Sequence, residues 1–127
     1  MSAKVNIMPA ILEKLKANFE TRLELAILLS SSIQIDIMNG SFVPHTTWAE
    51  PDEIEKLPSA GSANFELHLM VDDPTSVMPA WSNLKSVKQV LAHIECFNDK
   101  SAPDGGVGEF INTCKSFGWN ACLAINP

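Results

Sequence analysis

Apolar residues recur along this chain with two spacings, one typical of helices and one typical of strands, and segments of the two kinds follow each other in turn. Between residues 11 and 29 they lie mostly three or four positions apart, which places them on one side of a helix. Elsewhere they alternate with polar residues or form short runs, as in strands. The segments with strand character are residues 5–8, 33–38, 64–71, 88–96 and 120–127. The unit recurs roughly every 25 to 30 residues, about the length of one βαβ step.

Residues that start and stop helices fall between these strands. Asp73 followed by Pro74 predicts a helix start, because Asp caps free N–H groups and Pro is tolerated at the first helical position. Pro79 should keep that helix short. Further helices are expected within residues 50–57 and 107–117.

Five strands joined by helices predict an α/β fold with a parallel sheet. Periodicity alone leaves two architectures open, an open doubly wound sheet and part of a barrel. The fifth strand begins at Asn120 and has no helix after it to cover it.

Composition narrows the class of partner. The chain has 127 residues, enough for one compact domain, and 46% of them are hydrophobic against 19% charged. The net charge of -6 would repel nucleic acid and anionic membranes, which leaves a small molecule as the expected ligand. No apolar stretch is long enough to span a bilayer and the N-terminal segment lacks a signal-type run, so we expect a cytoplasmic protein. Three cysteines, Cys96, Cys114 and Cys122, are interpreted as core thiols.

Several short motifs carry more specific information. They read IQIDIMNGSFVPHTTW at 33–48, LHLMVDDP at 67–74, HIE at 93–95 and LAINP at 123–127, after IMPAIL at 7–12. In order and spacing they resemble the ribulose-phosphate 3-epimerase family, a resemblance that covers the whole chain. It implies a (β/α)8 TIM barrel, which typically takes ~250 residues. Residues 1–127 would then be the N-terminal portion of a single barrel, about the first five of its eight β/α units, with no second domain.

The resemblance also implies a reaction. Members of the family invert C3 of a ketopentose phosphate in the pentose phosphate pathway by passing a proton through an enediolate. Two opposed carboxylates move the proton, and a divalent metal ion (Zn, Fe or Mn) stabilises the developing oxygen charge as a Lewis acid. The implied activity is therefore that of a metal-binding carbohydrate isomerase acting on a sugar phosphate.

Site residues follow by position from the same resemblance. Asp36 matches the first carboxylate, which both transfers the proton and binds the metal, and His68 matches a metal-binding histidine. Met38 and Met70 match methionines beside the reacting carbons, although filling gaps in the core is the slightly favoured role for both when the residues are taken alone. Ala10 occupies the position of a serine that holds substrate.

Other positions depart from the family pattern. Gln34 stands where a metal-binding histidine is usual, and an amide oxygen is a poorer ligand for such ions than imidazole. Asn39 replaces an aspartate. The second carboxylate, from strand seven, and the phosphate-binding loops after strands six to eight are not in this sequence. We therefore expect the chain to be inactive by itself, and to form a homo-oligomer or aggregate through its open sheet edges.

Alternatives remain both for the function of the whole protein and for the roles of individual residues. The protein as a whole fits a catalytically silent relative that binds a sugar phosphate or a protein partner, or an epimerase of a hexulose 6-phosphate. His93 and Glu95 fit either support of a metal site or ordinary hydrogen bonding, which is favoured. The glycine-rich stretch at 104–108 fits an anion cradle or a plain loop, and the loop is favoured.

Overall fold

The structure is a computed structural model that describes residues 3–127. Met1 and Ser2, which open the N-terminal segment searched for a signal, lie outside the described residues. Strands and helices alternate along the chain, as predicted. The strands are β1 (Ala10–Ile11), β2 (Ser32–Met38), β3 (Asn64–Met70), β4 (Val87–His93) and β5 (Asn120–Ala124). The α-helices are α1 (Lys16–Leu29), α2 (Pro51–Glu55), α3 (Pro74–Val77) and α4 (Val107–Ser116), with 3-10 turns η1 (Pro58–Ser62), η2 (Met78–Trp81) and η3 (Ile94–Cys96).

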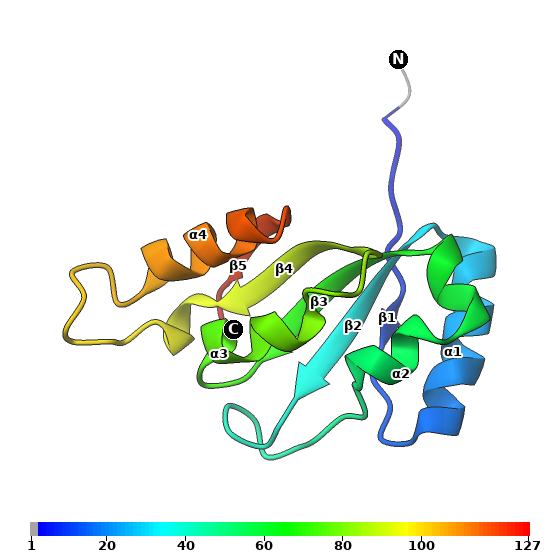
Figure 1. Ribbon diagram of the computed structural model, residues 1–127, viewed down its shortest axis with the longest axis horizontal. Coiled ribbons are helices and arrows are strands. Elements are labelled where there is room, and N and C mark those ends of the chain that lie inside the picture. Colours follow the sequence, from blue (N-terminus) through cyan, green and yellow to red (C-terminus); the bar gives the residue numbers. More distant parts are fainter. Residues whose placement is uncertain (1–2) are drawn as a thin grey trace.

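All five strands form one parallel sheet in the order β1-β2-β3-β4-β5 (Figure 1). Each strand therefore pairs with the next one along the chain, which is the order of consecutive β/α units in a barrel wall. A doubly wound sheet would instead reverse its strand order at a switch point. The topology selects the barrel-type architecture from the two that periodicity left open.

Alternating side chains give the sheet two unlike faces. On β2, Ile33, Ile35 and Ile37 are buried and belong to a single hydrophobic core. That core also contains Phe19 and Leu23 of α1, and beyond these Trp81 after α3 and Phe110 of α4. The helices thus cover the face that carries these isoleucines, which we call the outer face. The residues between them, with their neighbours on the other strands, form the inner face.

Two predicted boundaries near the N-terminus were wrong. Residues 5–8 form no strand, and β1 lies just after Pro9, whose carbonyl accepts a hydrogen bond from the Gln34 N–H at 2.8 Å. Helix α1 begins at Lys16 rather than Ile11, because Ile11 is committed to the sheet. Consequently Leu12 and Leu15, two of the apolar residues whose spacing predicted one side of a helix, precede α1 and are exposed.

The later elements follow the sequence signals more closely. Asp73 caps α3 by accepting the Ser76 N–H, and α3 passes into a 3-10 turn before Pro79. Strand β4 ends at His93, three residues before the predicted end, because the chain turns into η3. Within residues 3–127 no helix is long and apolar enough to cross a bilayer.

Candidate functional site

The inner face collects the polar residues of the three central strands. Asp36 of β2 lies in register with His68 of β3, and Met38 with Met70 one step further along. Because the strands are parallel, these positions all lie toward the carboxyl end of the sheet, where barrel enzymes place their chemistry. Residues that alternate with the buried positions along β2 and β3 therefore lie side by side on the inner face.

Asp36 and His68 are in direct contact. Asp36 Oδ1 lies 3.0 Å from His68 Nδ1. Their side chains are 14% and 18% exposed, so the pair is mostly shielded but still open to a ligand. An ionised carboxylate only accepts hydrogen bonds, so the proton in this contact belongs to His68 Nδ1. Asp36 Oδ2 takes part in no hydrogen bond among the described residues, which leaves an oxygen available to receive a proton.

A third residue extends this pair. His93, at the end of β4, places its Nε2 2.7 Å from His68 Nε2, and the two imidazole rings stack with centroids 5.0 Å apart. Phe42, from the loop after β2, packs against His93, with their ring centroids 5.1 Å apart. Asp36, His68 and His93 thus form a continuous hydrogen-bonded row, which we call the inner row.

The backbone at Asp36 is fixed by a loop residue that sequence analysis did not single out. The Thr47 hydroxyl donates to the Asp36 carbonyl at 2.8 Å and accepts from the Met38 N–H at 3.0 Å. The Thr47 N–H also donates to the Met38 carbonyl at 3.0 Å. Three hydrogen bonds therefore hold the loop after β2 against the strand end that carries the carboxylate.

The remaining predicted site residues lie near the inner row but do not join it. Gln34 is half-buried two positions before Asp36, in register with Glu66 and with Ala10, which is exposed. Glu66 accepts a hydrogen bond from Gln89 of β4. Met70 is buried and Met38 is half-buried, beyond the inner row toward the strand ends. Both methionines are placed to border a ligand bound at Asp36.

The donor set is too small for a divalent metal ion. Catalytic zinc-type sites use three protein ligands and keep one position open. Residues 3–127 contain no group of three or more His, Cys, Asp or Glu side chains arranged to hold a metal. Gln34 supplies only a neutral amide, and both ring nitrogens of His68 are engaged by Asp36 and His93. As they stand, the described residues do not fit a metal.

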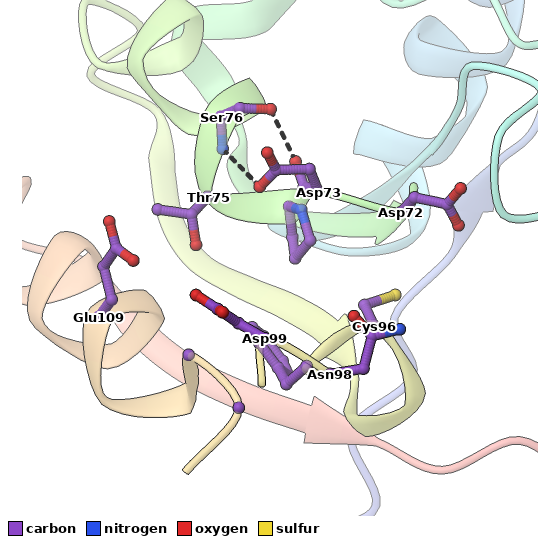
Figure 2. A pocket seen from close by; sticks show the side chains of 12 residues that line it. Asp72, Asp73, Thr75, Ser76, Cys96, Asn98, Asp99 and Glu109 are labelled. Atoms are coloured by element: carbon purple, nitrogen blue, oxygen red, sulfur yellow. Dashed lines mark hydrogen bonds between the residues drawn. The ribbon is translucent and has the colours of Figure 1, made fainter. Parts of the chain in front are cut away.

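A separate pocket of about 570 Å³ lies between α3, the loop after η3 and the start of α4 (Figure 2). Its lining includes four acidic residues, Asp72, Asp73, Asp99 and Glu109, and no basic one. Figure 2 shows Asp73 bonded to Ser76, with Asp99 on the opposite side of the hollow. Like charges would repel a phosphate here, so this pocket is a poor candidate for the phosphate of a sugar phosphate.

The glycine-rich stretch before α4 is a loop with its own acceptor. The Asp104 carboxylate accepts the N–H groups of Gly106 and Gly108 at 3.0 and 2.7 Å. These bonds lower the pKa of Asp104 from its ordinary value. Since an internal carboxylate already occupies these donors, the stretch does not offer them to an external anion.

The cysteines differ in burial. Cys114 lies in the core, and burial raises its pKa to about 11. Cys96 and Cys122 are only half-buried, and burial raises the pKa of each thiol as well. The Cys96 thiol donates to the Val71 carbonyl at 3.0 Å. None of the three is an activated thiolate.

Strand order and site position together define the class of protein. Consecutive parallel strands, helices on the outer face and an acid–histidine pair at the carboxyl strand ends characterise a barrel-type α/β enzyme fold. Residues 6–127 match the model of the ribulose-phosphate 3 epimerase family, so the chain belongs to that family. No curated protein matches the chain.

Family membership makes the five-stranded sheet part of a TIM barrel and implies a carbohydrate epimerase that is generally metal-dependent. Sequence analysis named Asp36 and His68 as site candidates, and the structure brings these two side chains into contact. It favoured ordinary hydrogen bonding for His93, whose partner is His68, and it did not single out Thr47. His93 carried a signal, because it ends a strand on the same face as His68. Thr47 carried none, since a loop threonine is common and its partner is a backbone atom.

Proposed function

We propose that this chain provides one half of a sugar-phosphate epimerase site, in which Asp36 is the acid/base group. Support comes from the 3.0 Å contact between Asp36 and His68 on the inner face, in a chain of this family. Asp36 would take the proton from the carbon next to the ketone of ribulose 5-phosphate. His68 would hold one carboxylate oxygen and leave the other free. Met38 and Met70 would border the developing enediolate with apolar, polarizable surface.

Inversion at carbon needs a second proton donor on the opposite side of the substrate. Asp36 is the only carboxylate in the inner row, and Glu66, the next one on this face of the described sheet, is bonded to Gln89. None of the nine basic residues lies within 33–44, 64–71 or 120–127 to bind a phosphate. We therefore expect residues 1–127 alone to bind sugar phosphates weakly and not to epimerise them.

The exposed apolar surface supports self-association. The accessible surface is 7600 Å², whereas a compact monomer of 13.9 kDa exposes about 6,700 Å². The excess of about 900 Å² is close to the ~800 Å² that each partner buries in a standard interface. Leu25, Leu28 and Leu29 of α1 are exposed, and so are Leu123 and Ile125 at the β5 edge. We expect a second copy of this chain to cover part of this surface, as a homo-oligomer in the cytoplasm.

Sizing tests the association separately from the chemistry. Light scattering on a chromatographed sample should give a mass of at least two chains, falling on dilution toward 13.9 kDa. A sample that stays monomeric at the highest concentration would contradict the homo-oligomer.

A chimera tests the chemistry. Residues 1–127, in which β5 is the last element, would be joined to the fifth helix and the last three β/α units of an active family member, which carry the second carboxylate and the phosphate-binding loops. The chimera should convert ribulose 5-phosphate to xylulose 5-phosphate and exchange the C3 proton with solvent deuterium. The C-terminal units alone and the 127-residue chain alone serve as controls and should be inactive. A chimera that folds, by circular dichroism and sizing, yet neither epimerises nor exchanges would contradict the proposal.

Gln34 supports a second candidate function. With an amide in place of an imidazole and no metal-binding cluster among residues 3–127, the chain also fits a silent relative that binds a sugar phosphate or a protein partner. In that case Asp36→Asn would leave ligand binding intact, and the folded chimera would show no proton exchange with ribulose 5-phosphate or with hexulose 6-phosphates.

A further inference from the structure

His93 is the one residue of the inner row for which the family resemblance gives no role. Its Nδ1 is buried and, among the described residues, has no hydrogen-bond partner. Its Nε2 lies 2.7 Å from His68 Nε2, a distance at which one of the two nitrogens must carry the hydrogen. The direction of that hydrogen bond decides which tautomer His68 adopts.

Two facts in the inner row fix the direction. The carboxylate of Asp36 accepts from His68 Nδ1, so a neutral His68 carries its proton there and presents a lone pair at Nε2. His93 Nε2 must then be the donor, and the buried His93 Nδ1 is left with an unused lone pair. In the reverse direction His93 Nδ1 would be a buried N–H with no acceptor, which is the rarer and costlier arrangement.

We propose that His93 is a positioning residue that locks His68 in the Nδ1–H tautomer and so aims its N–H at Asp36. The Phe42 ring packs against His93 at a tilt of 43° and Thr47 holds the end of β2, so both ends of the row are fixed. The consequence for catalysis rests on the proposed function: with Oδ1 held by His68, Asp36 meets its substrate through Oδ2. In this arrangement His68 Nδ1 carries a proton, so this nitrogen is not available as a metal ligand.

Nitrogen NMR on the 127-residue chain tests this directly. The chain has only three histidines, so ring-¹⁵N labelling gives few signals, and His45→Gln, on an exposed loop, identifies the third one without touching the row. We expect a protonated Nδ1 and a bare Nε2 on His68, a protonated Nε2 on His93, and a scalar coupling between the two Nε2 atoms. Magic-angle spinning of sedimented protein gives the same readout if the chain associates.

Two variants separate donation from packing. His93→Leu removes the donor, so the coupling should disappear and His68 should become a mixture of tautomers. His93→Gln keeps an N–H donor and should restore the Nδ1–H form. A wild-type spectrum with His68 protonated at Nε2 overturns the proposal even if both variants fail to fold. So does an unchanged tautomer in folded His93→Leu.

The outcome is independent of turnover because no substrate is present. A tautomer and coupling as expected, together with an inactive chimera, would contradict the epimerase function and leave the role of His93 standing. An active chimera with the opposite tautomer of His68 would support the epimerase function and contradict the role of His93.

Discussion

The outer and inner faces of the sheet are formed by the same strands but differ in burial and in the kind of contact their side chains make. On the outer face Ile33, Ile35 and Leu67 are fully buried against helices and make only apolar contacts. On the inner face Asp36 and His68, one position away along the same strands, are half-buried and bonded to each other. Because side chains alternate along a strand, one face packs into the core while the other keeps polar side chains that are still partly accessible.

The largest effect expected from this comparison is on stability. Leu67→Ala on the outer face should lower the free energy of unfolding by about 2–5 kcal/mol, because it leaves a cavity in a closed core. Leu91→Ala is the matched control on the inner face, where the side chain is half-buried, and should cost only about 1 kcal/mol. Urea unfolding at one fixed protein concentration measures both. Equal losses would contradict the division between the faces.

A smaller effect concerns metal binding on the inner face. Gln34→His would add an imidazole on the same face as Asp36 and His68. A zinc ion that displaces the proton shared by Asp36 and His68 would then meet three donors in place of two. We expect zinc affinity to rise at least roughly tenfold, about 1.4 kcal/mol, in equilibrium dialysis. His45→Gln with Gln34→His controls for binding at the exposed loop histidine. Wild-type protein that already binds one zinc as tightly as the variant would show that the donor set is sufficient.

The smallest effect lies in the outer layer, at the start of α4. Hydrogen bonds from Gly106 and Gly108 lower the folded-state pKa of Asp104 below its ordinary 3.8, so its ionised form stabilises the fold. That contribution is fully present above about pH 3.8 and disappears as the pH falls through the lower folded-state pKa. Asp104→Asn should therefore slightly lower the urea midpoint at pH 7. The difference should fade in acid, and one that persists unchanged at low pH would refute this.

Sequence pattern predicted the outer face better than the inner one. Alternation at Ile33, Ile35 and Ile37 fixes which residues pack, because burying apolar area depends on pattern more than on partner. It also put Asp36 on the opposite face, but only the parallel register showed that His68 lies beside it. The shared face of His68 and His93 could be read from the alternation, but their hydrogen bond could not, since it depends on strand spacing and on ring orientation across 25 residues of sequence.

The same limit explains the errors near the N-terminus. Residues 5–8 are as apolar as a strand, yet β1 forms at Ala10–Ile11, where Pro9 can accept a hydrogen bond from β2. An apolar run predicts burial, but pairing with the neighbouring strand determines which residues in or near that run join the sheet. The extended residues Val5 and Ile7 consequently remain exposed.

We propose that Asp36 carries the chemistry of this protein and contributes little to its stability. Asp36→Asn in the chimera tests it, with C3 deuterium exchange and urea unfolding measured on the same sample. The amide keeps the size of the side chain and one acceptor for His68, so we predict a loss of exchange of about 10²–10⁴-fold with little change in the free energy of unfolding. Exchange that survives the substitution, or a variant that no longer folds, would contradict this role of Asp36.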